Sequence, residues 1–324
     1  MAAAPYRSRR SVLAVPASNP RFVEKAREIA SDAFFLDLED AVAPSEKDRA
    51  RDAAAAALTE GGWGARVRTV RVNALDTPWT YRDVITVVER AGADLDCLVL
   101  PKVTDPVHVQ WLDLLLTQVE RACGLEPGRI GIEAQIEDAR GLSAVDAVAA
   151  ASPRLEALVF GPADFMASMN MRGLEVGEQP AGYDVGDAYH YVLLRILTAA
   201  RANGLQAIDG PNLKVRAPEA FQTSARRTAA LGYDGKWTVH PSQVEAANTV
   251  YAPDQAEFDR AERILEAYEH ATSVQRRGAV TLDGEMLDEA SRKMALVVSA
   301  KGRAAGLVRS GAARSDAADA PGAG

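Results

Sequence analysis

The chain of 324 residues has only two cysteines, and it lacks any stretch of about 18 uncharged apolar residues. The missing apolar stretch excludes a membrane-spanning helix. Cys97 lies in an apolar run and Cys123 near the end of a predicted helix. We therefore expect reduced, mostly buried thiols rather than a disulfide or a metal pair, which favours a cytoplasmic protein.

An excess of basic side chains is also missing. The sequence has 37 lysines and arginines against 45 aspartates and glutamates, a net charge of -8. This balance opposes a general attraction to nucleic acid or to anionic lipid, so we expect neither as a partner. An anionic ligand would need a local basic pocket.

The composition that is present, 48% hydrophobic and 25% charged, is that of a globular protein with a large core. Short apolar runs alternate with amphipathic helical patterns along most of the chain. Eight such runs begin at Ser11, Phe34, Arg68, Cys97, Ile130, Ala157, Gln206 and Lys236. Strands that alternate with helices predict a parallel sheet, and eight units predict a closed (β/α)₈ TIM barrel of the α/β class over residues 9–250.

The sequence continues beyond the eighth unit. Residues 253–272 and 288–301 have helical patterns, with a turn-rich segment at 277–284 between them. We therefore predict a C-terminal helical extension over residues 251–306. Residues 307–324 are small and polar without periodicity, which predicts a disordered tail.

Charged residues follow several of the predicted strands, where a barrel of this kind builds its active site. Glu137 and Asp164 follow the fifth and sixth strands. Two hard carboxylates with no cysteine or histidine nearby suit Mg²⁺. The alternative is a pair of carboxylates that are solvated or paired with arginine.

Arg71 follows the third strand, and its planar fork suits a carboxylate or a developing oxyanion. The alternative is an ion pair with Asp37, Glu39 or Asp40 near the end of the second strand. The two interpretations can hold together.

Eight motifs agree in order and spacing with one known family. They are FLDLEDAVAPSEKDRAR, RVNALDTPW, LPKV, IEDARGL, FGPADF, DGP, GKWTVHPSQ and GEMLDEASRKMA. From about Arg9 to Gly306 the chain resembles the citrate lyase β-subunit-like (HpcH/HpaI aldolase) family, and most closely its malyl-CoA/β-methylmalyl-CoA lyases. The resemblance implies a Mg²⁺-dependent carbon-carbon lyase, with Mn²⁺ as a possible substitute.

Residue roles follow from the resemblance position by position. It implies that Glu137 and Asp164 bind the metal, that Arg71 contacts substrate, and that the backbone amides around Ala163 and Asp164 hold the carboxylate of a 2-oxoacid. Asp288 would come from the neighbouring subunit as a catalytic acid/base. The extension would then be a lid on that subunit, in a homotrimer or a hexamer built as a dimer of trimers.

Coenzyme A is implied as part of the substrate. In similar enzymes it is held by a lysine of the first helix, here Lys25, and by the loop after the first strand, here with Ser18 and Asn19. Val239 and His240 would line the same pocket. The loop departs from the family's Gly-rich, Arg-containing form, because this chain has Val-Pro-Ala-Ser-Asn there.

The expected reaction is reversible cleavage of a 3-hydroxyacyl-CoA (malyl-CoA, β-methylmalyl-CoA or citramalyl-CoA) into an acyl-CoA and a 2-oxoacid such as glyoxylate. The base that deprotonates the hydroxyl stays open among Asp37, Glu39 and a metal-bound water. Alternatives are a malyl-CoA thioesterase, a malate-synthase-like enzyme, and a citrate lyase β-type subunit acting on a carrier-bound thioester. A class II aldolase for free oxoacids is disfavoured by Lys25 and the extension.

Overall fold

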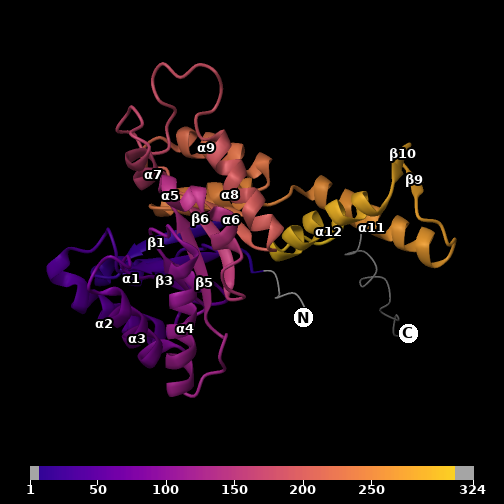
Figure 1. The fold of residues 1–324 in the computed structure, drawn as a ribbon. Helices are drawn as coiled ribbons and strands as arrows, with labels where there is room; N and C mark the ends of the chain where they lie inside the picture. The colour runs from indigo at the N-terminus through magenta and orange to yellow at the C-terminus, as the bar shows by residue number, and fades with distance from the viewer. Residues whose placement is uncertain (1–6, 311–324) are drawn as a thin grey trace, which may run out of the picture. The chain divides into compact units, whose positions relative to one another are not determined.

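The computed structural model of the protein describes residues 7–310 and divides them into two units. One unit is Arg9–Tyr251, and the other contains the residues from Ala252 onward together with those before Arg9. Figure 1 labels many of the helices and strands of both. The C-terminal tail predicted over 307–324 lies mostly outside the described residues.

Eight parallel strands form a closed barrel in the first unit, which confirms the predicted fold. The last strand closes on the first, with Ser11 opposite Lys236. The strands are β1 (Ser11–Pro16), β2 (Ala33–Asp37), β3 (Val67–Arg71), β4 (Cys97–Leu100), β5 (Gly131–Ile136), β6 (Leu155–Phe160), β7 (Gln206–Asp209) and β8 (Gly235–Thr238).

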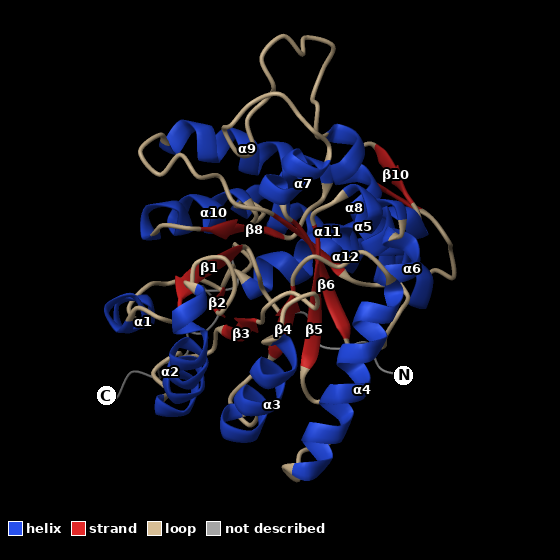
Figure 2. Cartoon of the chain, turned by 60° about the vertical axis from the view of Figure 1, so that its left-hand side comes forward, coloured by secondary structure: helices blue, strands red, loops and turns tan. Residues whose placement is uncertain are grey.

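Helices surround these strands (Figure 2), because each helix buries its apolar stripe on the outer face of the barrel. The longer ones are α1 (Pro20–Arg27), α2 (Lys47–Glu60), α3 (Thr80–Ala91), α4 (Pro106–Ala122), α8 (His190–Ala202) and α9 (Pro218–Leu231). The short ones are η1 (Pro44–Glu46), α5 (Ala139–Ser143), α6 (Val145–Ala149), α7 (Pro162–Ser168), η2 (Pro241–Gln243) and α10 (Val244–Val250).

Side chains fill the inside of the barrel. Phe35 and Trp237 lie with ring centroids 4.3 Å apart within a buried cluster of inward-facing residues. At the N-terminal end of the strands, Arg9 is 1% exposed and forms ion pairs with Glu133 at 2.9 Å and Glu156 at 2.7 Å. This end is therefore closed, which leaves the carboxyl ends of the strands to hold a site.

The C-terminal unit consists of α11 (Gln255–Ser273), β9 (Val280–Leu282), β10 (Glu285–Leu287) and α12 (Glu289–Ala304). Both predicted helices are present. The segment predicted as turn-rich contains the first strand and the turn of an antiparallel hairpin, β9–β10. Each of its strands is too short to give a strand pattern in the sequence. Gly302 of α12 packs on Phe258 of α11, since a Cβ there would lie 2.2 Å from the ring.

The cysteines and the longest helices relate to two expectations from composition. Neither Cys97 nor Cys123 forms a disulfide. Cys97 is buried, but the expectation of burial was wrong for Cys123, which follows α4 and is exposed. Within residues 7–310, no helix is both long enough and apolar enough to cross a membrane.

The seam between β8 and β1 gives a test of barrel closure. A Cβ on Gly235 would lie 1.8 Å from the carbonyl oxygen of Arg9, so the two backbones must separate. Gly235→Ala should lower the free energy of unfolding by about 3 kcal/mol or more, because overpacking typically costs about 1–3 kcal/mol and this clash is severe. Gly278→Ala is the control, because nothing lies within 4 Å of its Cβ position, and it should change stability by less than about 0.5 kcal/mol. Equal stability of the two variants in urea unfolding would contradict the tight seam.

Candidate functional site

A pocket of about 720 Å³ opens at the carboxyl ends of β3 to β6. This volume is typical of small-molecule sites. Its wall is contributed by the loops and short helices that follow these strands. The lining residues are Ala74, Leu75, Asp76, Lys102, Thr104, His108, Glu137, Asp138, Arg140, Asp164, Ala167 and Ser168.

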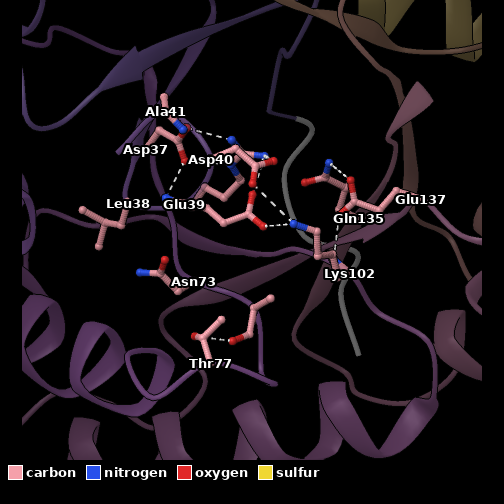
Figure 3. Close-up of polar contacts among 12 residues, drawn as sticks. Asp37, Leu38, Glu39, Asp40, Ala41, Asn73, Thr77, Lys102, Gln135 and Glu137 are labelled. Carbon is pink, nitrogen blue, oxygen red and sulfur yellow. Dashed lines mark hydrogen bonds and ion pairs between the residues drawn. The ribbon is translucent and has the colours of Figure 1, made fainter. Parts of the chain in front are cut away.

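Glu137 follows β5 directly and is 2% exposed. Its Oε1 accepts a hydrogen bond from the backbone N–H of Lys102 at 2.7 Å, and its Oε2 accepts one from Nε2 of Gln135 at 2.5 Å (Figure 3). Burial, together with the negative charges of Asp164 and Glu39, raises the pKa of Glu137 to about 8. A cation beside this carboxyl would offset both effects and favour its ionised form.

Gly161 makes room for this carboxyl. A Cβ at Gly161 would lie 2.4 Å from Oε2 of Glu137 and 2.8 Å from Nε2 of Gln135. The backbone that leads from β6 into α7 therefore packs directly on the Glu137 side chain. Asp164, in the first turn of α7, is only three residues further along the chain, and both carboxylates line the pocket.

The pair formed by Glu137 and Asp164 fits a hard divalent cation. Within residues 7–310, no group of three or more histidine, cysteine, aspartate or glutamate side chains is arranged to hold a metal ion. A cation here would take two protein carboxylates and complete its shell with water or substrate oxygens. Mg²⁺ is commonly bound in this way.

Arg71 lies at the end of β3 and is bound by two acidic residues from the end of β2. Asp37 accepts a bidentate pair of hydrogen bonds from Arg71, at 2.8 and 2.7 Å, and Glu39 lies 2.9 Å from Nη1. Burial alone would raise the pKa of Asp37, but the Arg71 guanidinium and the backbone N–H groups of Glu39 and Ala41 together hold this pKa below its usual range. The ion pair expected as one interpretation of Arg71 is present.

The two carboxyls beside Arg71 differ in their surroundings. Asp37 also accepts the backbone N–H groups of Glu39 and Ala41, so its charged form is fully hydrogen-bonded. Burial raises the pKa of Glu39, whose Oε1 accepts Nζ of Lys102 at 2.7 Å. Its Oε2 is near Arg71 but outside hydrogen-bonding geometry, and it has no hydrogen-bond partner. Glu39 is therefore better placed than Asp37 to accept a proton.

Lys102 was not among the predicted site residues, although its place after the fourth strand was visible in the sequence. It lines the pocket, and its φ of 53° is in the left-handed region, which costs a residue other than glycine about 1–2 kcal/mol. No sequence pattern indicated this conformation. His108 also lines the pocket, with Nδ1 accepting the backbone N–H of Thr104 at 3.4 Å.

Helix α2 holds the two loops that carry these groups. Nζ of Lys47 is buried and donates to the carbonyl oxygens of Leu38 and Glu39, both at 2.8 Å. One turn further along α2, Arg51 binds Asp83, which in turn accepts the backbone and side-chain N–H groups of Asn73. The loops after β2 and β3 are thus fixed to the same helix.

Other predicted residues lie outside the pocket lining. Asn19 caps α1, its neighbour Ser18 is half-buried, and Lys25 is exposed on α1. Val239 is half-buried. His240 caps η2 by accepting the N–H of Ser242.

The last two predicted residues lie in different units of the structure. Ala163 is exposed beside Asp164 in α7. Asp288 caps α12 in the C-terminal unit by accepting the N–H groups of Ala290 and Ser291. These bonds lower the pKa of Asp288.

Comparison with known proteins gives consistent matches. Residues 10–241 match the HpcH/HpaI aldolase/citrate lyase family. The L-malyl-CoA/beta-methylmalyl-CoA lyase of Cereibacter sphaeroides is 39% identical over 304 residues, covering 91% of this chain and 95% of that protein. The citrate lyase subunit beta of Escherichia coli K12 is 36% identical over 282 residues, covering 87% and 89%.

Solved structures agree with these matches. Protein CitE from Mycobacterium tuberculosis, in complex with magnesium, acetoacetate and coenzyme A, superimposes with a TM-score of 0.67 at 27% identity, covering 92% of this chain and 98% of that one. A citrate lyase from Burkholderia xenovorans LB400 has a TM-score of 0.78 at 21% identity, covering 94% and 95%, and supports the fold alone.

The buried ion pair at the site predicts a large loss of stability when one partner is removed. Arg71→Met leaves Asp37 charged, buried and unpaired, which should cost about 3–5 kcal/mol in free energy of unfolding. Arg90→Met is the control, because Arg90 pairs with Asp52 on the surface, where such pairs contribute about 0–1 kcal/mol. The measurement is urea unfolding of both variants at neutral pH. A loss below about 1 kcal/mol for Arg71→Met would show that Asp37 finds other compensation.

Proposed function

The chain belongs to the HpcH/HpaI aldolase/citrate lyase family and is a carbon-carbon lyase, and from this premise we propose that it cleaves a 3-hydroxyacyl-CoA reversibly into an acyl-CoA and a 2-oxoacid. The observation that carries the proposal is the carboxylate pair Glu137 and Asp164 in a pocket of about 720 Å³. The substrates are malyl-CoA, β-methylmalyl-CoA or citramalyl-CoA, with glyoxylate as one 2-oxoacid. The name of the Cereibacter sphaeroides relative supports this choice.

Mg²⁺, or Mn²⁺ in its place, would be held by Glu137 and Asp164. When bound, it supplies a Lewis acid for the oxygens of the 2-oxoacid portion. The charge of the site supports a divalent cation, because carboxylates outnumber cations there. The carboxylates are Asp37, Glu39, Asp40, Asp76, Glu137, Asp138 and Asp164, and the cations are Lys47, Arg71, Lys102 and Arg140.

Arg71 and Glu39 have separate chemical roles at the reacting carbon. Arg71 stabilises the oxyanion that develops as the carbon-carbon bond breaks, and Asp37 keeps its fork oriented. Glu39 takes the hydroxyl proton, because Oε2 has no hydrogen-bond partner and burial favours its protonated form. Ala163 and Asp164 offer backbone N–H groups to the carboxylate of the 2-oxoacid.

Coenzyme A and the assembly complete the proposal. Lys25, Ser18 and Asn19 bind the coenzyme, and Val239 and His240 line the same pocket. The barrel, residues 9–250, is the catalytic domain, and residues 251–306 are a lid on a neighbouring subunit of a trimer or a dimer of trimers. Asp288 of that lid protonates the acyl-CoA enolate as it departs, and removes the proton in the condensation direction.

A second candidate is a lyase component that acts only on a carrier-bound thioester. The 36% identity to the citrate lyase subunit beta of Escherichia coli K12 supports it. Turnover of a free CoA thioester by the isolated protein separates the two candidates, because only the first accepts it without a carrier.

The metal assignment predicts that chelation abolishes cleavage of malyl-CoA and that Mg²⁺ or Mn²⁺ restores it. Glu137→Gln and Asp164→Asn should each lose activity and bind Mn²⁺ at least about tenfold more weakly, because each removes one charged ligand. Calorimetric Mn²⁺ titration and a 2-oxoacid assay measure the two effects, and circular dichroism checks the fold. Full activity in excess chelator would disprove the assignment.

The assignment of Asp288 predicts a shared active site. Asp288→Asn keeps the cap of α12, because asparagine caps helices as well as aspartate does, but it removes the acid. This variant should lose about 10²- to 10⁴-fold in rate and still bind Mn²⁺ normally. Mixed with inactive Glu137→Gln under subunit exchange, it should regenerate active sites that contain both native residues. If exchange is verified and the mixture stays inactive, Asp288 does not act on a neighbouring barrel.

A further inference from the structure

Lys102 contacts carboxylates from both sides of the pocket with two different parts of the residue. Its backbone N–H donates to Oε1 of Glu137 at 2.7 Å. Its Nζ donates to Oε1 of Glu39 at 2.7 Å and to Oδ1 of Asp40 at 3.4 Å (Figure 3). Glu137 follows β5 and Glu39 follows β2, so one residue after β4 links two distant strand ends.

The backbone at Lys102 is one that glycine or asparagine would adopt more easily. Its φ of 53° is in the left-handed region. Such a conformation persists in a larger residue when the surrounding contacts fix it, and it is found frequently at functional sites. Here glycine would give the same N–H to Glu137 with less strain, but it would not give the ammonium.

The ammonium fixes the orientation of the Glu39 carboxyl. Arg71 donates two hydrogen bonds to Asp37, and its Nη1 lies 2.9 Å from Oε2 of Glu39. With Oε1 of Glu39 on Lys102, Oε2 is left without a hydrogen-bond partner. Removing the ammonium would free Oε1, and the Glu39 carboxyl could then rotate about its contact with Arg71.

We propose that Lys102 is a positioning residue of the lyase reaction: its N–H fixes Glu137 and its ammonium fixes Glu39, so that the two carboxylates keep one spacing and Oε2 of Glu39 stays beside Arg71. The proposal rests on the function proposed above, in which Glu137 binds the metal and Glu39 takes the hydroxyl proton. Lys102 acts through these two residues and has no proton-transfer role of its own.

The first test compares Lys102→Met with Lys102→Arg. Methionine keeps the backbone N–H and most of the stem but removes the charge. We expect Lys102→Met to lower kcat by about 10- to 100-fold, with KM for the thioester within about threefold of the parent. Lys102→Arg restores a cation for Glu39 and should recover part of kcat. Equal losses in the two variants, or a Lys102→Met enzyme within about threefold of the parent kcat, would overturn the proposal.

Metal binding separates positioning from general damage to the site. Because the N–H to Glu137 remains and a nearby positive charge is lost, Lys102→Met should bind Mn²⁺ as tightly as the parent or more tightly. Mn²⁺ binding weakened more than about twofold would indicate a disrupted site and contradict the division of roles between the backbone and the side chain.

A double-mutant cycle with Glu39→Gln tests the route of the effect. If Lys102 acts through Glu39, the double variant should be no slower than Glu39→Gln alone, whereas independent effects would multiply. Multiplying effects would overturn the proposal.

A crystal structure of Lys102→Met provides a readout that does not depend on the substrate. The Glu39 carboxyl should move while Glu137 stays. An unmoved Glu39 would overturn the proposal even if no thioester is turned over. Failure of the proposed function would appear differently, as a parent enzyme without metal-dependent cleavage.

Discussion

The bidentate contact between Arg71 and Asp37 is the interaction on which the rest of the site depends. The two residues are directly opposite each other in the register of β2 and β3, so the pairing of these strands itself brings them together. Once Arg71 is held, Glu39 two residues later lies beside the same guanidinium. Two cationic side chains of α2 then fix the loops that follow β2 and β3. Lys47 binds the loop after β2, and the Arg51–Asp83 pair binds the loop after β3. The contacts that α2 makes therefore depend on the loop positions that the Arg71–Asp37 pair establishes.

The barrel separates its polar groups into two ends with different chemistry. At the N-terminal end, Arg9 and its two glutamates form a closed group in which the charges are paired. At the carboxyl end, carboxylates outnumber cations, and burial raises the pKa of both Glu39 and Glu137. An excess of buried like charge destabilises a protein unless a ligand compensates it. The paired end and the packed centre around Phe35 and Trp237 therefore stabilise an end that is arranged for binding.

The sequence predicted the parts of this arrangement that repeat. Strand and helix alternate with a regular period, so all eight strands and the long helices could be placed. The strand ends then indicated Glu137 and Asp164, which line the pocket, and Arg71, which binds Asp37 and Glu39. Lys102 could not be found in this way, because its role comes from a left-handed backbone that no pattern encodes. The short helices α5 to α7 and the β9–β10 hairpin have too few residues to show a period. Arg9 contacts Glu133 and Glu156, which lie 124 and 147 positions further along the chain and thus beyond the reach of local sequence patterns.

The close packing of Gly161 on Glu137 has a consequence for how the substrate range of this scaffold can change. No side chain fits at position 161 without moving the carboxyl, so the inner wall of the pocket has a fixed shape. Part of the remaining wall is formed by two small, exposed residues of α7, Ala167 and Ser168. Larger or more polar side chains at these two positions alter the space in the pocket and leave the carboxylates in place. Divergence of specificity, in nature or by engineering, is therefore directed to the rim and away from the strand ends.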